Sequence, residues 1–577
     1  MKTTFVMRTI VMTSVLFTTT GRFSTAIEYR AIMLSGQPAP GFPVGQVFGE
    51  NLSYVNFSAT INKSGEVAFQ NALDVSGQGG LGSDVPTIWT GGNHPLNLVA
   101  RIDVPPPAPT TGNVSLFNGP FFIRYTSTSY PKNVRDTDIS DDGTIVFGGT
   151  YDIDATHYED AIWTAGSNHP WSVIAHTHQQ APGAAAGVYF DGFYAPFISK
   201  SGRVAFAADL EGPGVVYDTN HLGIWSQDGS SLKLLARTGA QAPGLSAGSN
   251  FTWFTSSRSG YFTNSGGPLS FSAEFKRSDA SNGAGIWAER TPGNLELVVQ
   301  TGQPAPTAAG GLLFDSFGES TTGPLGHTAF AAGVNSSGVY DFHPDNTLWV
   351  EDGHGGLRLV ASQGQLAIGG SIPWTFAGFE TPAVDAAGHV ASRAVLVNGG
   401  FLSNTDSVWY ERPDGAYKML AMAGAHAPGL PTDATFQQHD WQAFSDPVMD
   451  SSGQVAFMAY WYDGQNSGSG IWATDASGHL QRIASTRQTI DIDPDPAIVN
   501  LKTIGSLTMQ NDNHDFFQPL SLSDRGEIAF VARFTDGTNG VLIATIPVPE
   551  CQPLAIAAIL GAVTLLKRTS RTKTARD

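Results

Sequence analysis

The stretch INKSGEVAF, Ile61–Phe69, decides the fold, because seven related stretches follow it along the 577-residue chain. They are ISDDGTIVF (Ile139–Phe147), ISKSGRVAF (Ile198–Phe206), TNSGGPLSF (Thr263–Phe271), TGPLGHTAF (Thr322–Phe330), VDAAGHVAS (Val384–Ser392), MDSSGQVAF (Met449–Phe457) and LSDRGEIAF (Leu522–Phe530). Spacings of about 60 to 80 residues between copies are typical of a repeat architecture. The sequence therefore predicts eight copies of one structural unit.

Each copy predicts a β-hairpin. In most copies a short polar residue such as Asn62 or Asp385 stands three residues before a shared glycine, where its side chain can hydrogen-bond the turn backbone. The glycine supplies the positive φ of a tight turn. The eight are Gly65, Gly143, Gly202, Gly267, Gly326, Gly388, Gly453 and Gly526. Apolar residues then alternate, as in Val67 and Phe69, which predicts a strand with one buried face.

Two further elements follow the hairpin in each unit. The first carries a tryptophan in seven units, at Trp89, Trp163, Trp225, Trp287, Trp349, Trp409 and Trp472, and Leu542 in the eighth. Regular aromatics of this kind indicate packing between units, and a ligand platform is the alternative. The second element is an apolar strand that leads into a Gly/Pro loop, as in LKLLARTGAQAPG, Leu232–Gly244.

The two ends of the array share one unit. Unit eight stops at about Ile546 without its last strand, and the missing piece, YRAIMLSGQPAPG, stands at Tyr29–Gly41. A linear array gives no reason for this division, whereas a ring does, because the first strand then completes the last blade and leaves no open sheet edge. We therefore predict an all-β, eight-bladed β-propeller over residues 27–547, closed by its N-terminal strand.

The motif at Asn62–Phe69 and its seven relatives resemble a bacterial tandem-repeat family described by the pattern NxxGxxAF. The resemblance covers nearly the whole predicted ring and implies surface display, with no catalytic residues to carry over. Two copies depart from the pattern, because Gly323 replaces its Asn in copy five and Ser392 replaces its Phe in copy six.

The N-terminal segment, residues 1–26, is similar to a secretory signal peptide. Lys2 and Arg8 provide positive charge, Thr9–Phe17 is apolar, and small residues lead to a cleavage site at Ala26. A buried first strand or helix is the alternative.

The C-terminal segment, residues 548–577, joins Val548-Pro549-Glu550 to an apolar run, Leu554–Leu566, and a basic end. This order resembles the PEP-CTERM sorting signal, which implies processing by an exosortase-like enzyme around Pro549 and Glu550. Cys551 stands where the pattern has proline, so a system that reads the cysteine is an alternative. Another is a plain membrane tail, although the apolar run falls short of the roughly 20 residues of a spanning helix.

The net charge of the chain restricts the classes of partner that we expect. The chain carries 31 Lys and Arg against 50 Asp and Glu, a net charge of −19, and eight of the basic residues lie in the two terminal segments, so the body between them is more acidic still. An acidic body repels phosphate backbones, so nucleic acid is not an expected partner. Cys551 is the only cysteine, so no internal disulfide is expected.

Three groups of residues match known site chemistry. GLSAG, Gly244–Gly248, matches the string around a hydrolase nucleophile, but Ser246 falls in a predicted loop without the strand–turn–helix context. His176 and His178, two apart on a predicted strand, would share a face as metal ligands do, and an exposed pair is the alternative. Asp491, Asp493 and Asp495 offer hard oxygen ligands for calcium, with a solvated loop as the alternative.

These features favour an exported, non-catalytic surface or matrix protein that presents loops to a polysaccharide or another envelope component. Aromatics in the enlarged connection between units one and two, such as Phe121 and Tyr125, are candidates to stack on sugar rings or to fill space beneath the loop. Two alternatives stay open: an extracellular carbohydrate-active enzyme that uses the ring's central channel, and a calcium-stabilised adhesin.

Overall fold

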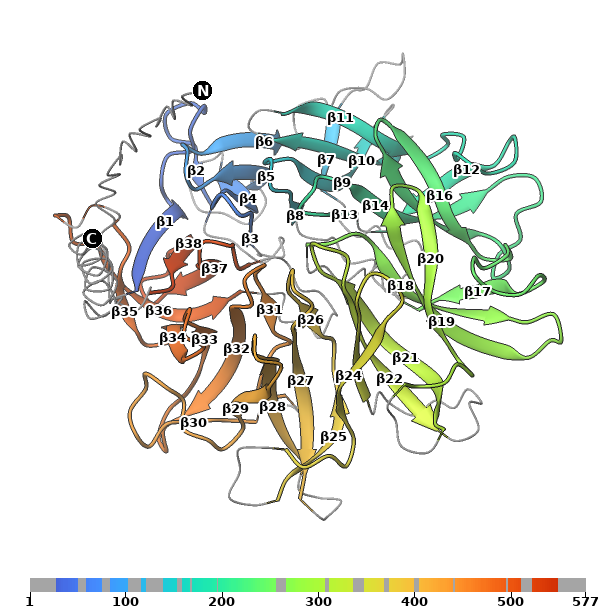
Figure 1. Cartoon of the computed structure of the whole chain (residues 1–577). Coiled ribbons are helices and arrows are strands. Elements are labelled where there is room, and N and C mark those ends of the chain that lie inside the picture. The colour runs from blue at the N-terminus through green and yellow to red at the C-terminus, as the bar shows by residue number, and fades with distance from the viewer. Residues whose placement is uncertain are drawn as a thin grey trace, which may run out of the picture. The chain divides into compact units, whose positions relative to one another are not determined.

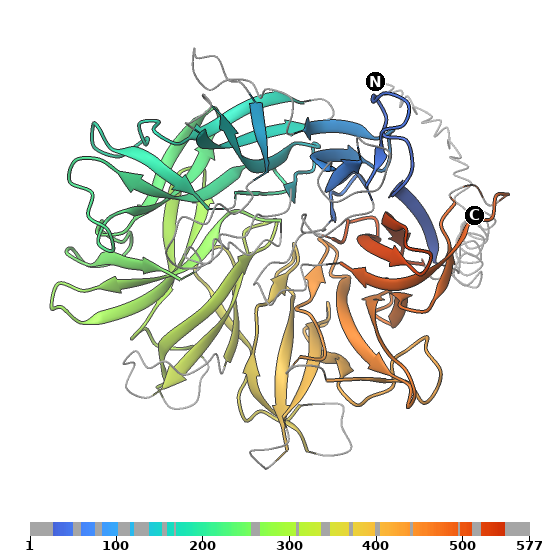
Figure 2. The ribbon, with the colours of Figure 1, turned by 180° about the vertical axis from the view of Figure 1, so that it is seen from behind.

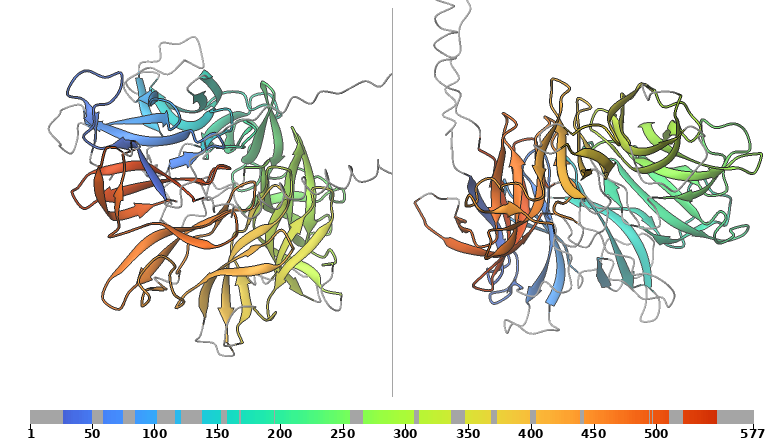
Figure 3. Two further views of the ribbon diagram at one scale, coloured as in Figure 1. Left: turned by 60° about the vertical axis from the view of Figure 1, so that its left-hand side comes forward. Right: turned by 90° about the horizontal axis from the view of Figure 1, so that it is seen from below.

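The repeated glycine turn joins the innermost strands of a sheet to its second strand, and this arrangement occurs in eight antiparallel sheets of the computed structural model. We call the sheets blades 1 to 8 in chain order, and their strands A to D from the centre outwards. Strands β3, β8, β13, β26 and β31 lie nearest the centre, and the blades radiate from it (Figure 1). The view from behind shows the same ring (Figure 2), and side views show strands running between its two faces (Figure 3).

The structure describes residues 27–49, 59–74, 84–101, 116–120, 138–152, 158–166, 169–194, 196–255, 266–306, 311–335, 347–367, 373–398, 404–438, 442–493, 495, 497–509 and 521–547. Residues 27–546 form one unit. No helix long and apolar enough to cross a membrane occurs in these ranges.

In the first four blades, strand A is often split into two short pieces. Blade 1 contains β2 (Val47–Phe48), β3 (Ala59–Ile61), β4 (Val67–Asp74), β5 (Asp84–Gly91) and β6 (Asn97–Arg101). Blade 2 contains β7 (Leu116–Pro120), β8 (Asp138–Ile139), β9 (Ile145–Asp152), β10 (Tyr158–Gly166) and β11 (His169–His176). Blade 3 contains β12 (Tyr189–Phe193), β13 (Phe197–Ile198), β14 (Val204–Glu211), β15 (Leu222–Asp228) and β16 (Ser231–Arg237). Blade 4 contains β17 (Asn250–Phe254), β18 (Ser270–Lys276), β19 (Asn282–Thr291) and β20 (Asn294–Gln300).

The other four blades follow the same plan. Blade 5 contains β21 (Leu313–Thr322), β22 (Thr328–Asn335), β23 (Thr347–Glu351) and β24 (Leu357–Ser362). Blade 6 contains β25 (Thr375–Phe379), β26 (Ala383–Val384), β27 (Val390–Val397), β28 (Thr405–Glu411) and β29 (Tyr417–Met422). Blade 7 contains β30 (Thr435–Phe436), β31 (Val448–Met449), β32 (Val455–Tyr462), β33 (Ser467–Thr474) and β34 (Leu480–Ser485). Blade 8 contains β35 (Thr489–Asp491), β36 (Leu501–Thr508), β37 (Glu527–Phe534), β38 (Asn539–Thr545) and β1 (Glu28–Leu34).

The N-terminal strand closes the ring as predicted. β1 pairs antiparallel with β38, from Glu28 opposite Thr545 to Leu34 opposite Gly540. It also contacts both neighbours of blade 8: the Tyr29 hydroxyl donates to the carbonyl of Ile483 in blade 7 at 2.5 Å, and Arg30 Nη1 donates to the carbonyl of Gly92 in blade 1 at 2.6 Å. The prediction of an eight-bladed propeller closed in this way is confirmed.

Packing between blades accounts for the repeated tryptophans. Each of eight buried hydrophobic clusters joins residues of two neighbouring blades, so every interface around the ring has its own core. All seven predicted tryptophans are fully buried in these clusters. Trp225, for example, packs edge-on against Phe190 and donates its indole N–H to the carbonyl of Pro182 at 3.0 Å. Burial of such a side chain contributes on the order of 1.5–3 kcal/mol.

The connection from strand D to the next strand A contains a repeated turn with the same backbone hydrogen bond. A residue with positive φ donates its N–H to the carbonyl of a large apolar residue in the next strand A, as Gly302 does to Phe314 at 2.8 Å. In five copies this residue is glycine, at Gly36, Gly239, Gly302, Gly364 and Gly424. In two copies it is His178 (φ 60°) or Arg487 (φ 68°), where the left-handed conformation costs a side-chain-bearing residue about 1–2 kcal/mol.

Copy four departs from the predicted turn. The left-handed glycine there is Gly266, with φ 83°, and not Gly267. Gly267 instead donates its N–H to the carbonyl of Thr322 in blade 5 at 3.0 Å, and an added Cβ would collide with the carbonyl oxygen of Gly323. Because two glycines are adjacent here, the sequence does not show which of them adopts the left-handed conformation. Gly267 is needed for the close contact with blade 5, so Gly266 takes the left-handed position.

Candidate functional site

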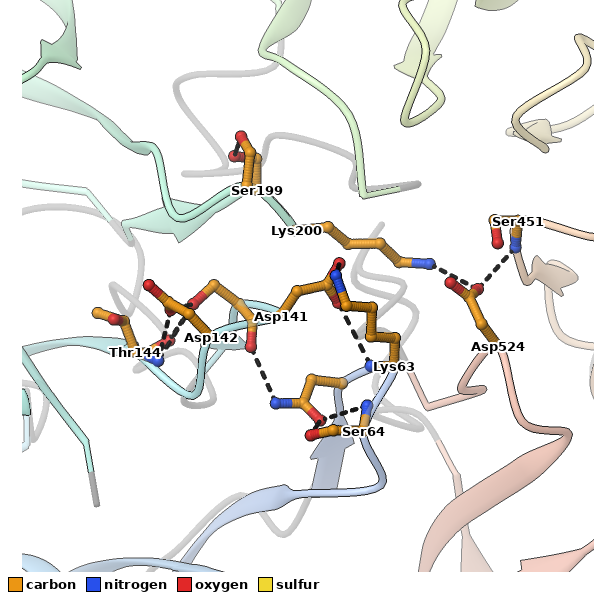
Figure 4. Close-up of polar contacts among 12 residues, drawn as sticks. Lys63, Ser64, Asp141, Asp142, Thr144, Ser199, Lys200, Ser451 and Asp524 are labelled. Atoms are coloured by element: carbon orange, nitrogen blue, oxygen red, sulfur yellow. Dashed lines mark hydrogen bonds and ion pairs between the residues drawn. The ribbon is translucent and has the colours of Figure 1, made fainter. Parts of the chain in front are cut away.

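Repeated turns between strands A and B meet at the centre of the ring, where their side chains form a polar cluster (Figure 4). Six of the described turns are stabilised by their own short polar residue, as predicted. Asn62 Oδ1 accepts the backbone N–H groups of Ser64 and Glu66, both at 3.0 Å, and Asp385 Oδ1 accepts those of Ala387 and His389, both at 2.8 Å. The residue after this polar one is therefore held in a fixed position at the axis.

Contacts between turns run from blade to blade. Lys63 Nζ lies 3.0 Å from Asp141 Oδ2, the Asp141 N–H donates to the carbonyl of Lys200 at 2.9 Å, and the Lys200 N–H donates to that of Gly266 at 3.1 Å. The turns of blades 1 to 4 are thereby linked in sequence.

Lys200 also reaches across the ring. Its ammonium lies 3.1 Å from Asp524 Oδ1 of blade 8, and the same oxygen accepts the backbone N–H of Ser451 in blade 7 at 2.9 Å (Figure 4). The Lys200 side chain is only 9% exposed. Burial raises the pKa of the Asp524 carboxyl, but Lys200 and the Ser451 N–H outweigh it, so the pKa lies below its usual value. The charges at this end of the axis are thus engaged in holding three blades together.

A second charged cluster lies between the inner strands of blades 6 and 7. Arg393 in β27 has Nε 3.2 Å from Asp446 Oδ1, Nη1 3.6 Å from Asp406 Oδ1 and Nη2 3.6 Å from Glu380 Oε1. Asp406 Oδ2 additionally accepts the N–H of Ala443 at 2.8 Å. Most copies have a small or apolar residue where copy six has Arg393, so this cluster is specific to one interface.

The Arg393 cluster has shifted acidities. Burial alone would lower the pKa of the Arg393 guanidinium, but Asp446, Asp406 and Glu380 outweigh it and raise the pKa. Burial raises the pKa of Asp446 to about 6, against the attraction of Arg393. Because three carboxylates surround one guanidinium, Asp446 is a group that exchanges a proton near neutral pH.

Buried glutamates fasten three further interfaces, and the sequence analysis did not identify them. Glu289, Glu351 and Glu411 each stand two residues after the repeated tryptophan and pair with an arginine of the preceding blade. The partners are Arg203 at 3.3 Å, Arg290, and Arg358 at 2.6 Å. A glutamate at this spacing in copies four to six is the signal that points to them.

The proposed calcium ligands are occupied by their own loop. Asp491 Oδ1 accepts the N–H of Asn500 at 2.9 Å, Asp493 Oδ1 that of Asp495 at 2.9 Å, and Asp495 Oδ1 that of Ala497 at 3.0 Å. No group of three or more His, Cys, Asp or Glu placed to hold a metal ion occurs in the described part of the chain. Calcium at these carboxylates stays a prediction, and its test is the melting temperature with and without chelator.

Other predicted positions have plain roles. Ser246 lies in the loop between β16 and β17, as expected, with its hydroxyl 3.3 Å from Ser249 Oγ. His176 ends β11 and His178 is the left-handed residue of the following turn, so the two do not share one strand, but the side chains of both meet Glu159, with His176 Nδ1 3.5 Å from Glu159 Oε2. Glu159 lies 3.1 Å from His178 Nδ1. Ala26, Pro549, Glu550 and Cys551, like Phe121 and Tyr125, lie outside the described residues.

Sheet topology and ring closure together define an eight-bladed β-propeller. The chain belongs to a protein family of unknown function, DUF7453, whose model matches residues 123–305 and 290–555. A search of curated proteins gave no significant match.

Among solved structures, the chain is similar to the β-propeller domain of the Trilobed protease from Pyrococcus furiosus, with 10% identity over 64% of this chain and 98% of that one and a TM-score of 0.24. It is similar to the periplasmic gluconolactonase PpgL of Pseudomonas aeruginosa (14% identity, 67% and 92% of the chains, TM-score 0.26). It is also similar to an α-L-arabinanase of Penicillium chrysogenum (10% identity, 62% and 92%, TM-score 0.25). Similarities this low carry no argument about function.

Proposed function

We propose that the protein is an exported, non-catalytic scaffold of the cell surface or extracellular matrix, whose rigid ring presents loops to a polysaccharide or another envelope component. The observation that carries the proposal is the Lys200–Asp524 pair, in which the buried charges at the centre of the ring join blades 3, 7 and 8. Charged groups used in this way stabilise the relative positions of the blades, and a fixed ring is a suitable support for binding loops.

The last strand of the ring ends on one of its two faces, which leaves the other face for binding loops. Thr545, at the end of β38, pairs with Glu527 directly after the glycine turn of blade 8, and the Ile546 N–H donates to the carbonyl of Gly526 at 2.7 Å. Thr545 and Ile546, at the end of the last strand, therefore lie on the face that carries the A–B turns. The D–A and B–C connections lie at the other ends of the strands, on the opposite face of the ring, where we propose that the ligand binds.

Cell fractionation and mass spectrometry test this proposal. We expect the protein in the envelope or extracellular fraction, with a mature N-terminus at Ile27 and with processing around Pro549, Glu550 or Cys551 by an exosortase-like or cysteine-reading enzyme. Full-length protein found only in the cytosol contradicts export. A matched Glu550→Gln variant shows whether the sorting motif is read, since retention of the unprocessed tail is then expected.

One observation favours a second function, that of a carbohydrate-active enzyme. Asp446 lies two residues before β31, an inner strand of blade 7, and a carboxyl with a pKa of about 6 is suited to general acid catalysis. Glu380, 44% exposed and close enough to Asp446 to raise its pKa, is the second carboxyl of such a pair. An assay of reducing-end release from a polysaccharide panel tests this candidate. Release that Asp446→Asn abolishes supports catalysis, and no release between pH 4 and pH 8 removes it.

A further inference from the structure

An exposed aromatic pair lies at the B–C end of blade 7. Tyr460 and Tyr462 occupy alternate positions near the end of β32 and are 38% and 40% exposed, while Trp461 between them is buried on the other side of the sheet. Ala456 and Met458, on the same side as the two tyrosines, pack into the core with blade 8. The tyrosines continue this row beyond the core, at a spacing of about 7 Å along the strand.

Hydroxyl groups accompany the tyrosines across the sheet. In the β32–β33 pairing, Ser469 stands opposite Tyr460 and Ser467 stands opposite Tyr462. Directly opposed residues of antiparallel strands point to the same side, so two aromatic rings and two hydroxyls share one surface. We call Tyr460, Tyr462, Ser467 and Ser469, with Asn466 and Arg487 at their edge, the tyrosine face.

Arg487 is held at this edge in a strained conformation. It adopts a φ of 68° at the position that is glycine in five other copies, and its Nη1 donates to Asn466 Oδ1 at 2.6 Å. Asn466 belongs to the same turn as Gly464, whose carbonyl accepts the Tyr462 hydroxyl at 2.7 Å. A guanidinium has five N–H donors, more than the bond to Asn466 uses. An arginine kept where glycine is unstrained indicates that its side chain has a role.

We propose that the tyrosine face binds an uncharged polysaccharide, with sugar rings on the faces of Tyr460 and Tyr462 and sugar hydroxyls bonded to Ser467, Ser469 and Arg487. Tyrosine combines an apolar ring with a polar tip, which suits a ligand whose rings have apolar faces and hydroxyl edges. A net charge of −19 disfavours an anionic polymer. The face adjoins the B–C turn of blade 7, on the side of the ring opposite the A–B turns. The proposal rests on the proposed function and names the ligand class and the surface.

Affinity electrophoresis of the full chain tests the proposal, with dextran or a β-1,3-glucan as the uncharged probe and alginate as the anionic one. We expect retardation by an uncharged glucan, and affinity roughly three- to tenfold lower for each of Y460A and Y462A, the range set by loss of one aromatic contact. Y189A is the matched control, because Tyr189 in blade 3 is 39% exposed and lies elsewhere on the ring, so its affinity should not change. R487G should also weaken binding without lowering the melting temperature, because glycine relieves the left-handed strain.

The outcomes separate this proposal from the wider one. Glucan binding that Y460A, Y462A and R487G leave unchanged overturns the tyrosine face but leaves a polysaccharide-binding scaffold. Retardation by alginate alone overturns the uncharged ligand while keeping a polysaccharide partner. No retardation by any of the three polymers overturns both the tyrosine face and a polysaccharide as the ligand of the scaffold.

Discussion

Replacing Asp446 by asparagine should stabilise the protein at neutral pH. The folded-state pKa of about 6 lies about two pH units above the usual aspartate value. The folded protein therefore binds an extra proton between pH 4 and pH 6. Stability from this group is complete below about pH 4 and is lost as pH rises through 6, at about 1.4 kcal/mol per unit. Asp446→Asn removes the ionisation but keeps the side-chain shape, so we expect a gain of about 2–3 kcal/mol at pH 7 and almost none at pH 4.

Differential scanning calorimetry of the full chain measures this effect. With an unfolding entropy of about 2 cal/mol/K per residue, a change of 1 kcal/mol in the free energy of unfolding shifts the melting temperature of a ring of this size by about 1 °C. The melting temperature of Asp446→Asn should therefore rise by about 2–3 °C at pH 7. Asp524→Asn is the control of opposite sign, because its pKa is lowered. A fall in the melting temperature of Asp446→Asn at pH 7 would refute the reasoning, since it would mean that the ionised Asp446–Arg393 pair is net stabilising.

Three further outcomes follow from the same structure. Asp524→Asn should lower the melting temperature at pH 7 by about 1–3 °C, because the buried Lys200 ammonium loses its partner. In a pH series the difference should shrink as the pH falls through the lowered pKa of Asp524 in the folded protein, and a difference that persists below that pKa would contradict this. Trp225→Ala should lower the free energy of unfolding by about 3–5 kcal/mol in a denaturation experiment, because the indole is fully buried between blades 2 and 3. A decrease of less than about 1 kcal/mol would show that this interface does not depend on the indole. Gly302→Ala should cost about 1 kcal/mol by backbone strain alone, as no atom lies within 4 Å of the added Cβ at φ 83°, and an unchanged melting temperature would argue against the left-handed turn.

The eight-bladed propeller could be predicted from the sequence because each unit repeats the same short-range sequence signals. Asn62 and Gly65 specify a turn, Trp225 marks a buried position, and the strand around Tyr29 is recognisable as the piece that unit eight lacks. Each of these signals lies within a few residues of sequence. Where the local signal was ambiguous, at Gly266-Gly267, the prediction of the left-handed residue failed.

The charged clusters could not be predicted from such short-range signals. Lys200 and Asp524 lie 324 residues apart and meet only because the ring places their turns at one axis. Arg393 is surrounded by carboxylates from strand β28 of its own blade, from the connection before β26 and from the next blade, so no sequence spacing predicts the group. The glutamates two residues after the tryptophans could have been noticed in the sequence, because they occur at a fixed position within the repeat. Their arginine partners could not, because they come from the preceding blade.

A disulfide between the two ends of the ring tests the central claim of circular closure most directly. Glu28 and Thr545 are cross-strand partners, and the 4.5–5.5 Å between Cα atoms of such pairs falls within the range that a disulfide bridges. In a Cys551→Ser background, E28C/T545C should oxidise to an intramolecular bond and raise the melting temperature, with reversal by reductant. E28C/T291C, whose second site is in blade 4, should stay reduced. Failure of E28C/T545C to cross-link, with the protein folded and both cysteines reactive, would contradict closure by the N-terminal strand.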